Sequence, residues 1–292
     1  MEFQANEEIR LDNYLSKELD ESRSQVSKII KNGEVLVNGK NVKAGYILKK
    51  GDIIIVNHKP LDDSIVPEKM DLDIVYEDED IIVINKANGV VVHPAPGNYN
   101  GTLVNGLLYH TKLSDLNGEV RPGIVHRIDA YTTGLLMIAK NNKTHEFLAK
   151  ELASKKAFRK YIALVWGNIK NDSGTVDAPI GRSLNDRKKM AVVSNGKEAI
   201  THFKVLKRFN EVTLIELRLE TGRTHQIRVH MDYIGHPVVN DPVYGNRKLI
   251  DNSGQCLHAK TLGFVHPKTL KYMEFDSELP ECFLNILKLF EK

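Results

Sequence analysis

The chain has 292 residues, of which 41% are hydrophobic, so it can form a large domain with a core plus a small one, and wholesale disorder is excluded. It contains no apolar run of about 18 residues, so we expect no transmembrane helix and no membrane partner. The acidic first residues lack the apolar region of a secretory signal. Two cysteines, Cys256 and Cys282, without a pairing motif fit a reducing compartment, so we expect a cytoplasmic protein.

The net charge of +3 is weak evidence for an anionic partner, but the distribution of charge is more informative. Residues 22–50 contain seven basic residues and one acidic residue, whereas residues 61–80 contain nine acidic residues and one lysine. A basic block followed by an acidic connector indicates two modules with different tasks. Charge alone also allows the simpler interpretation of two solvated faces.

The first module is predicted to be helix, basic helix and hairpin. Leucines repeat every fourth residue over 11–19, which indicates a helix. Ser22 and Gln25 have the spacing of a capping box in front of a second, lysine-bearing helix. Asn38-Gly39 follows an alternating apolar run and predicts a tight hairpin, and Ile53–Val56 reads as a closing strand.

This module resembles the small RNA-binding domain named after small-subunit ribosomal protein four, over roughly residues 8–57. The motifs are Arg10-Leu-Asp-x-x-Leu15, Ser22-Arg-Ser24 and Gly33-x-Val-x-Val-Asn-Gly39. The resemblance implies that the basic helix and the hairpin contact RNA phosphates, which supply affinity and not sequence reading. The residues expected to do so are Arg10, Arg23, Lys28, Lys31, Lys40 and Lys43. We place this domain at residues 1–60 and a proline-containing linker at 61–71.

The second module, residues 72–292, is predicted to be a large, mainly antiparallel mixed sheet with flanking helices, so that the whole chain has an α+β fold. Many strand-like runs adjoin through short turns instead of alternating with helices. The predicted strands are 74–76, 81–85, 89–92, 124–127, 135–140, 159–165, 199–206, 212–219 and 262–265, and the predicted helices are 103–110, 144–154, 224–233 and 281–289.

Several common chemistries have no motif here. The sequence contains no glycine-rich phosphate loop or dinucleotide turn and no nucleophile elbow around a serine. His225 and His230 are five positions apart, and two metal ligands on one helical face need four. We therefore expect no catalytic metal.

Asp129 lies in the segment His126-Arg-Ile-Asp-Ala-Tyr-Thr-Thr-Gly134, between two strand-like apolar runs. A loop between buried strands can present a carboxylate on a rigid scaffold. Taken by itself, this segment favours an ordinary turn residue, because aspartate is common in turns.

Two further segments carry candidate residues. Tyr161 lies in an apolar strand, where a tyrosine is usually a core residue, although in an RNA enzyme it could stack on a base. Arg223 is expected at the N-terminus of the helix over 224–233, where the helix dipole disfavours a cation. Asp129 or an RNA phosphate could compensate its charge, or it could be an exposed arginine without a role.

Together these segments resemble the RluA/RluD family of pseudouridine synthases across almost the whole chain. Its hallmarks occur in order: Asn85-Lys-Ala-Asn-Gly-Val-Val-Val-His-Pro94, Gly101-Thr-Leu103, His126-Arg-Ile-Asp129, Lys160-Tyr161, Thr221-Gly-Arg-Thr-His-Gln-Ile-Arg228, Gly235-His-Pro237, Asp241-Pro-Val-Tyr-Gly245, and Leu257-His-Ala259 with Phe264-Val-His-Pro267. Ala130-Tyr131 departs from the charged pair that commonly follows the aspartate in this family.

The resemblance implies isomerisation of uridine in RNA to its carbon-linked form, without cofactor or metal. It implies that Asp129 is the catalytic aspartate, that Tyr161 stacks on the target uracil, and that Arg223 pairs with the catalytic carboxylate. Arg127 matches the arginine that enters the RNA stack when the target nucleotide leaves it. The sequence leaves open whether Asp129 acts as nucleophile or as base.

The expected substrate is large-subunit ribosomal RNA, modified by a monomer. Two alternatives stay open: a non-catalytic RNA-binding or ribosome-assembly factor, and the same chemistry on transfer RNA. The extra RNA-binding module favours ribosomal RNA over transfer RNA.

Overall fold

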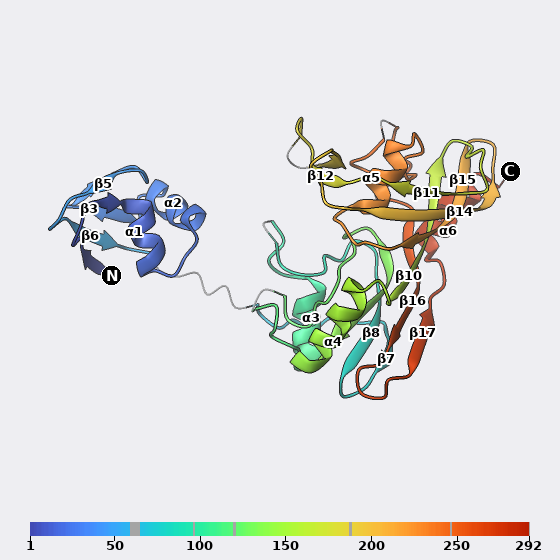
Figure 1. The fold of residues 1–292 in the computed structure, drawn as a ribbon, viewed down its shortest axis with the longest axis horizontal. Coiled ribbons are helices and arrows are strands. Elements are labelled where there is room, and N and C mark those ends of the chain that lie inside the picture. Colours follow the sequence, from blue (N-terminus) through green and yellow to red (C-terminus); the bar gives the residue numbers. More distant parts are fainter. Residues whose placement is uncertain (59–64, 96, 119–120, 187–188, 246, 292) are drawn as a thin grey trace. The chain divides into compact units, whose positions relative to one another are not determined.

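The computed structural model describes residues 1–58, 65–95, 97–118, 121–186, 189–245 and 247–291. The chain divides into two compact units, Met1–Asp63 and Ser64–Lys292 (Figure 1). None of the helices in the described ranges combines the length and apolarity needed to span a bilayer.

The first unit contains two helices on a small sheet of order β1-β6-β3-β4, with a separate β2-β5 pair. Val26, Ile29 and Ile30 of the second helix are buried, and the capping box at Ser22 and Gln25 is formed as the sequence predicts. The elements are β1 (Glu2–Gln4), β2 (Ile9–Arg10), α1 (Leu11–Glu18), α2 (Arg23–Lys31), β3 (Val35–Val37), β4 (Lys40–Asn41), β5 (Ile47–Leu48) and β6 (Ile53–Val56).

The second unit is built on a nine-stranded sheet of order β11-β14-β15-β10-β16-β9-β8-β7, with β17 paired to β16. All its described pairings are antiparallel except β9 with β16, which confirms the predicted α+β fold and mainly antiparallel sheet. The elements are β7 (Ile74–Glu77), β8 (Ile81–Lys86), α3 (Leu103–His110), β9 (Thr133–Ala139), α4 (Asn142–Ala153), β10 (Phe158–Trp166), β11 (Ser173–Asp177), β12 (Ile180–Arg182), β13 (Met190–Val192), β14 (Ile200–Arg208), β15 (Val212–Leu219), α5 (Gln226–Tyr233), β16 (Leu257–Val265), β17 (Tyr272–Asp276) and α6 (Glu281–Lys288).

Helices cover both faces of the sheet, and strand alternation explains how. In β8 and β9, every second residue packs with α3 and the residues between them pack with α4. In β10, Tyr161 and Ala163 lie on the face that carries α3 and α5, whereas Ile162 and Leu164 pack with α6 on the other face. Because helices cover both its faces, β9 is buried along its whole length.

Two predicted strands are wrong. Residues 89–92 and 124–127 form no strand, although Val92 and Ile124 are buried and Ile124 makes an isolated bridge to Ile138. Their apolar side chains enter the core from loops. An apolar run in the sequence looks the same in such a loop as in a strand. The short strands β11, β12, β13 and β17 were not predicted.

Part of the expected linker is ordered against the second unit. Within 61–71, residues 61–64 lie outside the described residues. The Val66 carbonyl accepts a hydrogen bond from the Asn105 side-chain amide at 2.8 Å, and the Glu68 amide donates to the Asn105 carbonyl at 3.0 Å. Met70 lies against Gly106, where an added Cβ would collide with its side chain. Residues 65–70 therefore pack on α3 instead of spanning free space.

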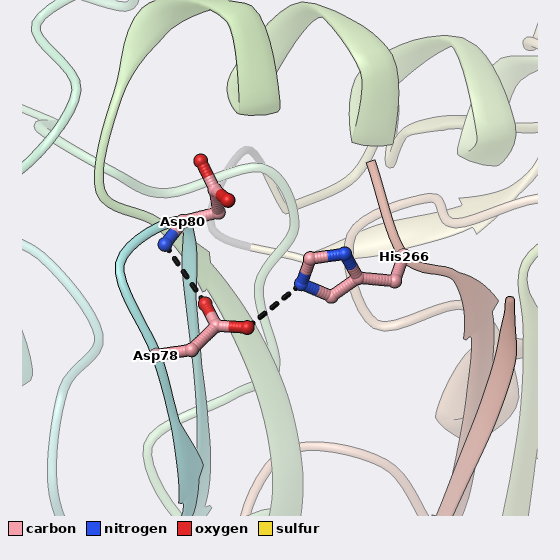
Figure 2. Close-up of side chains that lie close together, drawn as sticks. All are labelled: Asp78, Asp80 and His266. Carbon is pink, nitrogen blue, oxygen red and sulfur yellow. Dashed lines mark hydrogen bonds and ion pairs between the residues drawn. The ribbon is translucent and has the colours of Figure 1, made fainter. Parts of the chain in front are cut away.

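Figure 2 shows a cluster of Asp78, Asp80 and His266 at the turn between β7 and β8. The His266 Nδ1 accepts from the backbone amides of Lys268 and Thr269, so Nε2 carries the hydrogen and donates to Asp78 at 2.8 Å. The same carboxylate also accepts from the amides of Asp80 and Ile81. The ring nitrogen that a metal ion would need is already a donor, so this cluster is a hydrogen-bonded tie between two turns.

Candidate active site

The loop that carries Asp129 is fixed at the point where β9 and β16 begin side by side. Gly134 has a φ of 106°, and a Cβ there would overlap the Ala259 backbone, so only glycine allows this approach. Thr133 is hydrogen-bonded to His258 at 2.8 Å, and the Gln255 side-chain amide donates to Thr132 at 3.0 Å. The Thr-Thr-Gly sequence thus anchors the loop to a neighbouring strand.

Lys86, at the end of β8, holds the same loop from the other side. Its ammonium group donates to the carbonyls of Ala87, Val90 and Ala130 at 2.8, 2.9 and 2.7 Å. Burial lowers the pKa of Lys86 to about 7, against the opposing effect of the Asp129 charge. Because Ala130 follows Asp129 directly, Lys86 fixes the backbone next to the carboxylate.

Asp129 opens into a cleft of about 560 Å³ on the second unit. The cleft is also lined by Arg127, Tyr161 and Arg223, so the structure brings together all four candidate residues of this unit. Tyr161 is buried on the sheet, whereas Arg127 and Arg223 are exposed. Burial raises the pKa of the Tyr161 hydroxyl, which therefore stays protonated at neutral pH.

The arginine paired with Asp129 is Arg228, and the expected pairing of Arg223 is wrong. Arg228 Nη1 donates to Asp129 Oδ2 at 2.8 Å, whereas Arg223 Nε donates to the Glu198 carbonyl at 2.9 Å. The sequence placed a helix start at residue 224, but α5 begins at Gln226 after His225 adopts a left-handed φ of 57°. Arg228 lies in the first turn, where the cation that the dipole disfavours is compensated by Asp129.

Arg228 is itself held by a second carboxylate, Asp241, which was not among the predicted site residues. Its Nε and Nη2 donate to the two oxygens of Asp241 at 2.6 and 2.8 Å, and Asp241 also accepts from the amides of Val243 and Tyr244. Burial lowers the pKa of Arg228, but the bonds to Asp241 and the charges of both carboxylates outweigh it and raise the pKa above its ordinary value. Arg228 and Asp241 each belong to a family motif, but spacing alone could not pair them.

His225 lies on the other side of the carboxylate. Its Nε2 is 3.8 Å from Asp129 Oδ1, and its Nδ1 is 3.0 Å from the Tyr244 hydroxyl. Burial lowers the pKa of His225, opposed by the Asp129 charge, so the ring is neutral at pH 7. Oδ2 is thus engaged by Arg228, while Oδ1 accepts no hydrogen bond among the described residues and faces the cleft as the more available oxygen.

The RNA-binding candidates of the first unit lie on its surface. Lys28, Lys31, Lys40 and Lys43 are at least partly exposed, and Lys31 and Lys43 line one groove. Arg10 and Arg23 both donate to the buried carboxylate of Asp12, at 2.8 and 3.1 Å. Asp12, which was not among the predicted contacts, therefore fixes the positions of two of the expected phosphate-binding residues.

Comparison with known proteins shows the family to which the chain belongs. Residues 80–233 match the RNA pseudouridylate synthase family, and residues 9–54 match the S4 domain. The chain belongs to the RNA pseudouridine synthase family and is an isomerase with an N-terminal S4 domain, as the resemblance implied.

Its relatives agree along most of its length. An uncharacterised RNA pseudouridine synthase of Bacillus subtilis is 54% identical, over 97% of this chain and 94% of the relative. The ribosomal large subunit pseudouridine synthase D of Pseudomonas aeruginosa is 43% identical, over 94% of this chain and 89% of the relative. The structure of human RNA pseudouridylate synthase domain containing 1 matches with a TM-score of 0.60 at 25% identity, over 75% of this chain and 94% of that one.

Proposed function

We propose that this protein isomerises specific uridines of large-subunit ribosomal RNA, with Asp129 as the catalytic carboxylate. The observation that carries the proposal is the arrangement of Asp129 in the cleft, with one oxygen bound by Arg228 and the other available. The ribosomal substrate is supported by relatives that are named ribosomal large subunit pseudouridine synthase D.

The side chains around Asp129 suit the reaction. The glycosidic bond must break, the uracil must turn, and a ring carbon must rejoin the ribose. Asp129 would attack the ribose or remove its proton through a carboxylate oxygen, and the hydrogen bond from Arg228 Nη1 to Oδ2 fixes the orientation of that carboxylate. Tyr161 offers a ring for stacking on the uracil, and exposed Arg127 can fill the space that the nucleotide leaves in the RNA.

The first unit supplies affinity for RNA in this proposal. Its surface basic residues, Arg10, Arg23, Lys28, Lys31, Lys40 and Lys43, contact phosphates, and exposed Arg223 contacts a phosphate at the cleft. We further propose a cytoplasmic monomer, and light scattering of the purified protein would check the oligomeric state.

The experiment maps pseudouridines in ribosomal and transfer RNA from wild-type cells and from cells lacking the protein. Cells that lack it are then supplied with the wild-type chain or with Asp129→Asn. We expect particular sites in large-subunit RNA to disappear and only the wild-type chain to restore them. If sites disappear from transfer RNA instead, the substrate is transfer RNA and not ribosomal RNA.

A second candidate function is assembly of the ribosome without catalysis. Its support is the S4 domain together with Ala130-Tyr131, where Tyr131 is 42% exposed beside the catalytic loop. It predicts that cells lacking the protein keep every pseudouridine site but assemble ribosomes poorly, and that Asp129→Asn restores assembly as well as the wild-type chain does. Uridine isomerisation and ribosome assembly are measured in the same cells, so the results distinguish the catalytic function from the non-catalytic one.

A further inference from the structure

Arg159 is a largely buried arginine in the cleft, and no residue that the structure describes pairs with it. It lies near the start of β10, is 8% exposed, and its Nε has no hydrogen-bond partner. Within the described residues it forms no hydrogen bond or ion pair. Leaving a buried polar atom unpaired is unfavourable, so such a group in a native protein indicates a function.

The position of Arg159 is set by the sheet and by a glycine. Arg159 and Tyr161 are two apart on β10 and so share one face, and both line the cleft that contains Asp129. A Cβ on Gly222 would lie 2.9 Å from Arg159 Nη1. Gly222 therefore leaves the space that the guanidinium occupies beside the tyrosine.

Arg228 is already engaged by its two carboxylates and has no donor aimed at the leaving group. Arg228 is one cation between two carboxylates, Asp129 and Asp241, and its donors to them are already used. When the N1–C1′ bond of uridine breaks, its electron pair stays on the uracil and spreads to O2 and O4. Asp129 loses its charge in the same stage, either by bonding to C1′ or by taking a proton from C2′. The negative charge thus moves from Asp129 to the uracil.

We propose that Arg159 binds the detached uracil and stabilises the negative charge that it carries between cleavage and rejoining. This inference rests on the proposed function. The charge on the uracil is used when C5 bonds to C1′, and in the same stage Asp129 either leaves C1′ as a carboxylate or returns its proton to C2′. C5 then loses its proton to water and N1 gains one. A fixed cation in a buried position is worth most where charge develops only during the reaction.

A backbone phosphate fits Arg159 less well than the base does. Arg121, Arg127 and Arg223 also line the cleft and are exposed, where phosphates of a bound RNA can reach them. Arg159 lies deeper, beside the tyrosine expected to stack on the uracil. A flipped base reaches that depth, whereas the RNA backbone stays at the surface.

The test compares Arg159→Met and Arg159→Lys with Arg218→Met as a matched control. Arg218 is an exposed arginine on the adjacent β15, stacked over Phe158 at 5.6 Å, and it does not line the cleft. Single-turnover rates and KM are measured on ribosomal RNA fragments containing uridine or 5-fluorouridine at the modified site. The readout is loss of the nitrogen-linked nucleoside, together with the melting temperature of each protein.

We expect Arg159→Met to slow the single-turnover rate about 100-fold with little change in KM. The defect should be smaller with 5-fluorouridine, because fluorine makes the uracil a better leaving group. The melting temperature should be unchanged or higher, since methionine replaces an unpaired buried charge. Arg159→Lys should retain part of the rate, and Arg218→Met should behave as wild type.

Three results would overturn the assignment. A defect of equal size on both RNAs would mean that Arg159 does not act on the leaving group. A defect in KM alone, with a weaker salt dependence of binding, would make Arg159 a phosphate contact. A lower melting temperature with normal catalysis by the folded fraction would make it structural. If the wild-type chain isomerises no uridine, the proposed function itself is wrong. The wild-type rates, measured in the same series, distinguish that outcome from a wrong role for Arg159.

Discussion

Arg228 and Asp129 are joined by one hydrogen bond of 2.8 Å, and the Nε and Nη2 of Arg228 donate to the two oxygens of Asp241. This geometry requires a planar guanidinium, because one group bridges two carboxylates that come from different segments of the chain. The pairing leaves Oδ1 of Asp129, and not Oδ2, free of hydrogen bonds from the described residues.

Replacing Arg228 by lysine should therefore be far more damaging than replacing Arg223. Lysine is a point charge that cannot hold both carboxylates, so we expect Arg228→Lys to lower kcat by about 100-fold or more. Arg223→Lys, which keeps a cation at an exposed position, should alter KM more than kcat. Steady-state kinetics on the same RNA measure both. A larger kcat defect in Arg223→Lys would contradict a catalytic role for the Arg228–Asp129 pair.

Lys86 should support both stability and catalysis. Lys86→Met leaves the part-buried carbonyls of Ala87, Val90 and Ala130 without their donor, and each lost hydrogen bond costs about 1 kcal/mol. Because Ala130 adjoins Asp129, the folded fraction should also have a lower kcat. Urea unfolding and active-site-normalised rates measure the two effects.

Lys140→Met is the matched control for Lys86→Met. Lys140 is also mostly buried and donates to Glu77 and to the Asp78 carbonyl, in the turn between β7 and β8. It should destabilise the protein while leaving the kcat of folded protein unchanged. Equal kcat defects in the two variants would mean that Lys86 has no specific effect on the Asp129 loop.

The tie between Asp78 and His266 should make stability depend on acid pH. Burial raises the pKa of Asp78, but hydrogen bonds from Ile81, Asp80, Tyr76 and His266 outweigh it and hold the pKa at about 2, below its ordinary value of 3.8. A carboxyl group whose pKa is lowered by folding stabilises the protein above pH 3.8 and loses that effect as pH falls toward 2.

Asp78→Asn should therefore be less stable at neutral pH and should lose less stability between pH 4 and pH 2, the window set by the two pKa values. Denaturant unfolding at a series of pH values measures this slope. Identical slopes for Asp78→Asn and the wild type would show that this carboxylate does not contribute.

The first unit should bind RNA through phosphate contacts that salt weakens. For Lys31→Ala with Lys43→Ala, the affinity should fall for all RNA sequences, and the slope of log affinity against log salt should decrease by about 2. Filter binding at several salt concentrations measures this. Lys268→Ala, which removes an exposed cation paired with Glu79, should leave the slope unchanged. An unchanged slope in the double variant would place the RNA contact elsewhere.

Local periodicity and short motifs were enough to predict several features of this chain. The helices α3 and α6, strand β15 and the capping box of α2 follow from residue spacing within a few turns, and they formed as predicted. The order of the motifs along the chain was sufficient to indicate the family. Asp129 and Tyr161 could be selected in the same way, because each motif places its own residue.

The tertiary structure decided which of these residues meet. Whether Arg223 or Arg228 reaches Asp129 depends on where α5 begins, and that start is fixed by the left-handed His225 and its contact with Tyr244, which is distant in sequence. Asp241 and Lys86 contact residues that are distant from them in sequence, and motif spacing does not predict such contacts. The unpaired Nε of Arg159 can be recognised only once all the residues around it are placed. Side-chain pairing across segments depends on packing, so sequence motifs could propose the members of this site but not their contacts.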